Sequence, residues 1–304
     1  TYYDMIHKDC QKDEAADFRV KKYQLDFSVG LNLTGSAKVY VDRSELKSYR
    51  FTLYHGYKVK QVTDQTGAAL DFRREYDYVT VTRGGADVEY LCLEYTGKSP
   101  KYYSSYAGVC LPANFAYYPI PGYRELFKDS FYGFIDCSLP YDTAFDVRCS
   151  GRKQMYCNLA ARGNNHFAGN ARSITLLSGY YDTLKLNDTL VVYPKYADGE
   201  IRARIKKNMG TFTKEHRDIH TIFIMDADNL TPYEHLRSYD GYVVTNSMID
   251  MEQSYFESQI DISKLHFYKM FVYYYNEKVD REELEQLKPV SYTHLRAHET
   301  RHDL

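Results

Sequence analysis

The chain has 304 residues, of which 44% are hydrophobic, and its formal net charge is −2 at pH 7. This composition supports one large or two ordinary domains with a sizeable core, and the balanced charge excludes a dedicated nucleic-acid or anionic-membrane partner. The sequence has no tryptophan but 33 tyrosines, which suit half-buried strands and therefore favour a β-rich protein.

Residues 1–17 are polar and are predicted to be a linker. From Tyr23 to Leu33, apolar and polar residues alternate strictly, which is the pattern of a strand with one buried face. We expect a turn at residues 34–36 and a second strand at residues 37–41, so that the two strands form a hairpin. Further strands are predicted at residues 50–53, 57–63, 76–82, 89–95, 145–149, 173–177 and 189–192.

Many short strands at regular spacing are typical of an antiparallel sandwich or a twisted open sheet. We therefore predict a mainly β domain over residues 18–195. The segment 115–122 contains Pro119 and Pro121. Because proline removes ladder donors from an interior strand, this segment is predicted to be a rigid aromatic loop.

The character of the sequence changes after residue 195. Residues 198–214 are basic and compatible with a helix, whereas residues 221–225 and 241–245 are short apolar strand candidates. These features predict a partial α/β domain over residues 196–289, resembling a degenerate or truncated start of a thermolysin-like domain.

Two carboxylates follow the apolar stretch that begins at Thr221, in the order Asp226-Ala-Asp228-Asn229. Paired carboxylates at the carboxyl end of a strand often hold Mg²⁺ or Mn²⁺. The segment is similar to the Asp-Ala-Asp-Asn of sugar-nucleotide glycosyltransferases, which gives the hypothesis of a metal-dependent transferase using Asp226 and Asp228. The simpler interpretation is a strand-to-helix turn in which Asp and Asn cap the following residues.

The six cysteines show no metal-ligand spacing and are expected to be buried free thiols. His216 and His220 are four residues apart, so on a helix they would share a face and could ligate zinc. No Cys or Glu cluster completes such a site, so a polar helix face is favoured. The remaining candidate histidines have no partner at an informative spacing: His55, His166, His235 and His266.

Residues 18–194 resemble the N-terminal β domain of the aminopeptidase-N family of zinc peptidases in the order of their features. The resemblance is carried by Tyr-x-Leu-x-Phe at 23–27, the hairpin around Gly35, Leu-Glu-Tyr-Thr-Gly at 93–97, Tyr-Tyr-Pro-Ile-Pro-Gly at 117–122, Phe-Asp-Val at 145–147 and Met-Tyr-Cys-Asn-Leu at 155–159. It implies a scaffold β domain followed by a thermolysin-like domain.

The chain departs from this family in the motifs that carry catalysis. The Asp-Glu of the family's Phe-Pro-Cys-x-Asp-Glu-Pro loop is replaced by Ile120-Pro121-Gly122, and the Gly-x-Met-Glu-Asn motif has only a distant echo at residues 249–253. No catalytic, cofactor-binding or metal-binding residue can therefore be carried over. We expect no cofactor in this fragment, with zinc and a peptide substrate belonging only to an active full-length parent.

The tail, residues 290–304, contains a His-Glu-x-x-His motif made of His298, Glu299 and His302. The tail resembles one reading frame of the transposase-end adapter used for sequencing libraries, and we exclude it as adapter-derived. A zinc site of this class also needs a third ligand further along the chain, and only two residues follow His302. We therefore reject these three residues as metal ligands.

Because the chain opens at Thr1 without methionine, we expect a fragment of a longer open reading frame. The favoured hypothesis is a non-catalytic scaffold or recognition module of an aminopeptidase-N-like protein. The loop at 117–122 is also similar to that of peptidase-like domains fused to bacterial ABC-transporter permeases. This similarity implies a membrane-permease remainder as partner, on the extracytoplasmic face of the bacterial membrane. The alternatives are an active zinc aminopeptidase whose site lies beyond residue 289 and the transferase.

Overall fold

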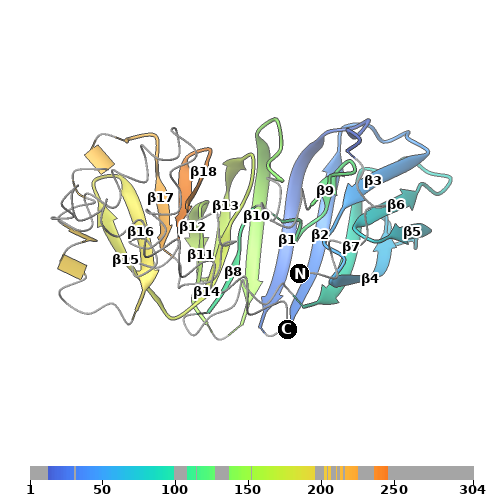
Figure 1. Cartoon of the computed structure of the whole chain (residues 1–304). Helices are drawn as coiled ribbons and strands as arrows, with labels where there is room; N and C mark the ends of the chain where they lie inside the picture. Colours follow the sequence, from blue (N-terminus) through green and yellow to red (C-terminus); the bar gives the residue numbers. More distant parts are fainter. Residues whose placement is uncertain are drawn as a thin grey trace, which may run out of the picture. The chain divides into compact units, whose positions relative to one another are not determined.

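The computed structural model describes residues 13–30, 32–98, 108–113, 115–126, 137–151, 153–195, 202–203, 205–206, 210, 213–214, 216–224 and 236–245. The chain divides into two compact units, Thr1–Tyr180 and Tyr181–Leu304, called here the first and the second unit. Each unit is built on its own β-sheets (Figure 1). None of the described helical segments is long and apolar enough to cross a membrane.

The first unit contains a seven-stranded sheet in the order β12-β13-β10-β1-β2-β7-β4. Its central strands β1 and β10 are parallel, and the other neighbours are antiparallel. The strands are β1 (Val20–Val29), β2 (Leu33–Val41), β4 (Tyr57–Thr63), β7 (Tyr90–Gly97), β10 (Thr143–Ser150), β12 (Ala160–Gly163) and β13 (His166–Ala171).

Two smaller sheets complete the first unit, with the orders β5-β6-β3-β9 and β11-β14-β8. Their strands are β3 (Ser48–Thr52), β5 (Phe72–Glu75), β6 (Tyr78–Thr82), β8 (Gly108–Leu111), β9 (Ile120–Pro121), β11 (Met155–Cys157) and β14 (Leu176–Gly179). Side chains of all three sheets belong to a single hydrophobic cluster. The predicted mainly β fold is therefore confirmed.

The alternation in β1 gives the seven-stranded sheet two different faces. Tyr23, Leu25 and Phe27 are buried and form part of the inner face, which belongs to the core. Asp26 and Ser28 are exposed and lie on the opposite, outer face. Since side chains of a strand alternate between faces, the pairing register assigns every residue of the sheet to one face or the other.

The hairpin turn lies earlier than the sequence predicts. β1 ends at Val29 and β2 begins at Leu33, so Thr34, Gly35 and Ser36 already belong to β2. Gly35 is needed inside this strand because a Cβ atom there would lie 2.6 Å from Cζ of the Tyr95 ring. The predicted turn was therefore wrong: the glycine makes room for an aromatic ring on the inner face and does not turn the chain.

The aromatic loop at residues 115–122 is fully buried. Tyrosine hydroxyls satisfy its carbonyl groups: Tyr23 donates to the Pro119 carbonyl and Tyr95 to the Tyr117 carbonyl, each at 2.8 Å. Tyr117 in turn donates to the Ile174 carbonyl at 2.8 Å. Only Ile120–Pro121 of this segment forms a strand, β9, which pairs with β3 at the edge of its sheet. The tyrosine hydroxyls add to this limited backbone pairing, which gives the buried tyrosines a structural role.

The second unit contains a five-stranded sheet in the order β15-β16-β17-β19-β18. β17 is parallel to both β16 and β19, and the described residues 202–203, 205–206, 210 and 213–214, between β16 and β17, are helical. The strands are β15 (Tyr181–Leu186), β16 (Thr189–Pro194), β17 (Thr221–Ile224), β18 (Leu236–Tyr239) and β19 (Tyr242–Thr245).

The division between the units comes before the predicted boundary at residue 195. The predicted β domain of residues 18–195 includes β15, which the sequence did not predict as a strand, and β16, which it did, but β16 pairs with β17 of the second unit. Periodicity identifies a strand and does not identify the sheet that it joins. The partial α/β domain over residues 196–289 stays a prediction, because most of those residues lie outside the described ones.

Candidate functional site

Two of the three candidate metal sites fall on residues that the structure does not describe. Asp226 and Asp228 follow β17, whose buried apolar residues are as predicted, but both lie outside the described residues. His298, Glu299 and His302 also lie outside them. Within the described ranges, no group of three or more His, Cys, Asp or Glu side chains is placed to hold a metal ion.

His216 and His220 do not lie on one helix face. Residues 217–218 form a turn, and the His216 carbonyl accepts the Ile219 amide at 3.2 Å. The backbone of His220 bonds to both sides, donating to the Gly241 carbonyl at 2.7 Å and accepting the Leu190 amide at 2.9 Å. No helix runs through the described residues 216–220, which already form the entry to β17, so the zinc pair that helical spacing would allow is not formed.

A part-buried His–Asp pair connects the β3–β4 loop to the β5–β6 hairpin. The Asp77 carboxylate accepts the His55 backbone amide at 2.6 Å and lies 3.0 Å from Nδ1 of the His55 ring. Tyr76 stacks on that ring at 4.2 Å and has a φ of 51°, which is unusual for a residue with a side chain. The side chain of Asp77 is only 6% exposed, so the pair holds the hairpin turn in place.

Arg74 stabilises the same hairpin through hydrogen bonds to backbone carbonyls. Its guanidinium donates to the carbonyls of Leu53, Tyr54 and Tyr76 at 2.8, 3.0 and 2.6 Å. Burial lowers the pKa of Arg74 to about 10, against an opposing effect of the Asp77 carboxylate. All three bonds go to the backbone of the same unit, so the group anchors loops and is not placed to act on a ligand.

A second His–Asp pair lies on the outer face of the seven-stranded sheet. His166 Nε2 is 2.9 Å from the Asp146 carboxylate, and Arg148 Nε lies 3.7 Å from the same oxygen. Sequence spacing does not reveal this pair, because its members are brought together by the pairing of β10 with β13.

Five of the cysteines are described, and all five are free thiols. Burial raises the pKa of Cys110 well above its usual value and raises the pKa values of Cys149 and Cys157 to about 12. These three thiols stay protonated at neutral pH, and since the thiolate is the nucleophile, they are unsuited to covalent catalysis.

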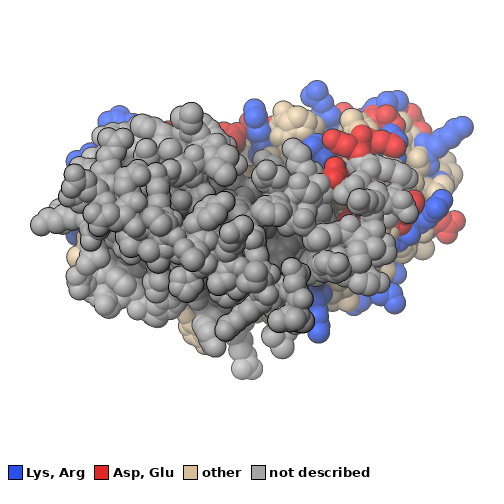
Figure 2. Space-filling view, in the orientation of Figure 1, with Lys and Arg blue, Asp and Glu red and all other residues tan. Residues whose placement is uncertain are grey.

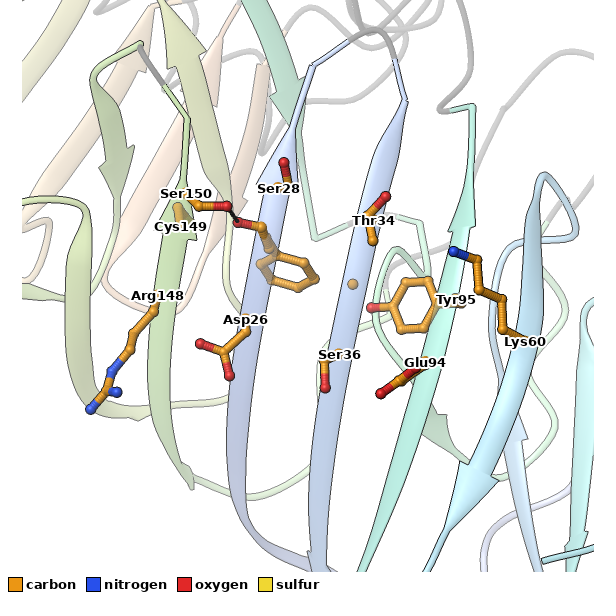
Figure 3. A pocket seen from close by; sticks show the side chains of 12 residues that line it. Asp26, Ser28, Thr34, Ser36, Lys60, Glu94, Tyr95, Arg148, Cys149 and Ser150 are labelled. Atoms are coloured by element: carbon orange, nitrogen blue, oxygen red, sulfur yellow. Dashed lines mark hydrogen bonds between the residues drawn. The ribbon is translucent and has the colours of Figure 1, made fainter. Parts of the chain in front are cut away.

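A hollow of the first unit lies on the outer face of the seven-stranded sheet (Figure 3) and has a volume of about 420 Å³. The strand register arranges its outward side chains in two rows. Ser150, Ser28 and Thr34 form a hydroxyl row across β10, β1 and β2. The neighbouring row contains Arg148, Asp26, Ser36 and Glu94 across β10, β1, β2 and β7.

Lys60 completes the lining from β4, where a β-bulge between Val59 and Gln61 places it outside the ladder register. Small hydroxyl side chains occupy the middle strands, and long charged side chains stand on either side of them. This difference in side-chain length makes the sheet surface concave there. Lys and Arg are interspersed with Asp and Glu over the described surface in Figure 2.

Part of the hydrogen-bonding capacity of this hollow is already used. Thr34 bonds to Thr96 at 2.9 Å between their hydroxyl oxygens, and the Ser150 hydroxyl donates to the Phe27 carbonyl at 3.3 Å. Within the described residues, the side chains of Asp26, Glu94 and Lys60 make no hydrogen bond or ion pair. The hollow therefore offers acceptors and donors that the fold itself does not use.

The sequence matches no protein-family model and no curated protein. The structure is similar to yeast LTA4 hydrolase, with a TM-score of 0.54, 10% identity and coverage of 78% of this chain and 42% of that one. A second structure, of leukotriene A4 hydrolase from Saccharomyces cerevisiae, gives a TM-score of 0.53 at 10% identity and covers 82% and 44%. The M1 zinc metallopeptidase of Deinococcus radiodurans gives 0.47 at 11% identity, covering 79% and 64%.

At these identities the likeness to the yeast enzyme establishes the fold alone, and the chain spans less than half the length of that enzyme. The sequence-based resemblance to the N-terminal β domain of the aminopeptidase-N family is confirmed at the level of the fold.

Proposed function

We propose that the chain is part of an aminopeptidase-like protein and that its first unit serves as a non-catalytic scaffold and recognition module. The similarity of fold to yeast LTA4 hydrolase supports the first half of this proposal. Zinc and a peptide substrate would then belong to the parent protein.

One observation supports the second part of the proposal, that the first unit is non-catalytic. The reactive side chains that the structure describes are either committed to the fold or exposed without a convergent partner set. His55 and Asp77 brace a hairpin, three thiols are buried with raised pKa values, and no described group of acidic, histidine or cysteine side chains converges on a metal position.

The test is a peptidase assay of the complete chain with alanine 4-nitroanilide, with and without added Zn²⁺. We expect no zinc-dependent hydrolysis, and we expect that removal of residues 290–304 leaves the unfolding midpoint unchanged, because we interpret the tail as adapter-derived. Hydrolysis that requires Zn²⁺ and is lost in Glu299→Gln would overturn both interpretations.

We also propose that the parent continues into a membrane permease and carries the first unit on the extracytoplasmic face. The support is the sequence of the loop at 117–122. The complete gene should then encode apolar spans of about 20 residues beyond this segment, and the tagged full-length protein should be cut by external protease in spheroplasts. A gene that instead continues into His-Glu-x-x-His and a downstream Glu, with no such span, favours the active zinc aminopeptidase.

A further inference from the structure

The outer hollow of the seven-stranded sheet is electrically balanced. Its lining holds two carboxylates, Asp26 and Glu94, and two cations, Arg148 and Lys60. The carboxylates belong to β1 and β7 and lie on either side of Ser36 in β2, in one row of the register. Neighbouring strands are about 4.8 Å apart, so the two acidic residues flank a gap of about two strand spacings.

The arrangement of these charges disfavours simple ions. A phosphate or carboxylate ligand over the middle of the hollow would face both acidic side chains. A metal cation would need a third ligand, and no such cluster exists among the described residues. A ligand without net charge meets neither obstacle, because the carboxylates do not repel it and it needs no third metal ligand. It also avoids the free-energy cost of removing water from a full charge.

The hydrogen-bonding groups of the lining restrict the possible classes of ligand further. Carboxylates only accept, ammonium and guanidinium groups only donate, and Ser and Thr hydroxyls do both. Asp26, Glu94 and Lys60 have no partner within the described residues. A ligand that satisfies all of them must present donors to two carboxylates about two strand spacings apart and an acceptor to Lys60. The hydroxyl groups around a sugar ring have this property, because each of them both donates and accepts.

We propose that this hollow binds a neutral saccharide. A hydroxyl pair of the sugar donates to the carboxylates of Asp26 and Glu94 and accepts from Lys60 or Arg148. The volume of about 420 Å³ lies within the usual range for small-molecule sites. This inference rests on the proposed recognition function and gives it a ligand class.

The first experiment is saturation-transfer-difference NMR of the complete chain with a panel of glucose, galactose, mannose, N-acetylglucosamine and their disaccharides. We expect transfer to at least one member of the panel. A parallel panel of neutral dipeptides tests the other class that carries mixed donors and acceptors. Transfer only to dipeptides, or to neither panel, would overturn the saccharide assignment.

The second experiment places the binding site. Charge-assisted hydrogen bonds are strong, so Asp26→Asn and Glu94→Gln should each weaken binding about tenfold or more. Both side chains lack partners in the fold, so the unfolding midpoint should not move. Glu75→Gln, an exposed substitution on β5, is the matched control and should bind the saccharide as tightly as the unsubstituted chain does.

Undiminished binding in the variant that combines Asp26→Asn with Glu94→Gln would place the saccharide elsewhere and overturn the proposal for this hollow. The outcome is separable from that of the peptidase assay. Absence of saccharide binding together with absence of hydrolysis rejects only the ligand class, whereas zinc-dependent hydrolysis rejects the non-catalytic function.

Discussion

The two faces of the seven-stranded sheet consist of alternate residues of the same strands, yet they use their polar groups differently. On the inner face, the buried hydroxyls of Tyr23 and Tyr95 each donate to a carbonyl of the aromatic loop. On the outer face, Asp26 and Glu94 have no hydrogen-bond partner among the described residues. The hydroxyls of Tyr23 and Tyr95 on the inner face are committed to the fold, whereas the carboxylates of Asp26 and Glu94 on the outer face are available to a ligand.

The largest expected effect is alkaline unfolding of the inner face. Burial raises the pKa values of Tyr23 and Tyr95 well above 10 and those of Cys149 and Cys157 to about 12. The unfolded chain ionises first, near pH 8.5 for Cys and 10 for Tyr, so stability is complete below these values and is lost as pH rises. Each group removes about 1.4 kcal/mol per pH unit in this window.

Several such groups together exhaust a domain stability of about 5–15 kcal/mol, so we expect the first unit to unfold at about pH 11. Urea unfolding followed by circular dichroism from pH 7 to 11 measures this. The double variant of Cys149→Ala and Cys157→Ala should lose about 2.7 kcal/mol less per pH unit between 9 and 11. An unchanged slope in that variant would show that these thiols are not buried as the structure places them.

The next largest effect concerns the aromatic loop. Tyr117 is fully buried, packs against Tyr118 and Phe115 at ring distances of 4.9 and 5.7 Å, and donates to the Ile174 carbonyl. Tyr117→Ala should therefore cost about 3–5 kcal/mol in the free energy of unfolding. The control is Tyr180→Ala, because Tyr180 is 63% exposed and should contribute less than about 0.5 kcal/mol. Equal losses would contradict the inner-face assignment.

The sequence predicts the inner face well because burial leaves a periodic signal. The alternation over residues 57–63 coincides with β4, and the apolar run at residue 221 coincides with β17. Strands without that signal were missed: β12 is exposed at every position and β5 is half-exposed. Gly35 was taken for a turn because its partner, the ring of Tyr95, lies far away in the sequence.

The outer face was not predictable in the same way. Its chemistry depends on which residues stand opposite each other, as when Asp26 pairs with Arg148 on one side and Ser36 on the other. Such pairing is fixed by topology, including the parallel contact of β1 with β10, and no local spacing encodes it. Asp146 and His166 meet for the same reason.

A substitution at Gly35 tests the packing of the inner face directly. The added Cβ of Gly35→Ala would press on the buried Tyr95 ring at 2.6 Å, which should cost about 1–3 kcal/mol. Gly85→Ala is the control, because no atom lies within 4 Å of its added Cβ. Gly35 and Tyr95 also border the outer hollow, so the readout for this variant is the free energy of unfolding, measured by urea unfolding. A loss no larger than that of Gly85→Ala would contradict the placement of the Tyr95 ring against Gly35.

The smallest expected effect compares the two His–Asp pairs. Asp146 on the outer face is 26% exposed and pairs with a 30% exposed His166, so Asp146→Asn should change the free energy of unfolding by less than about 1 kcal/mol. Asp77 is 6% exposed and accepts both the backbone amide and the ring of His55. Asp77→Asn should therefore cost about 1–3 kcal/mol. Urea unfolding of both variants at pH 7 measures the difference, and a larger loss for Asp146→Asn would mean that the outer pair, too, is committed to the fold.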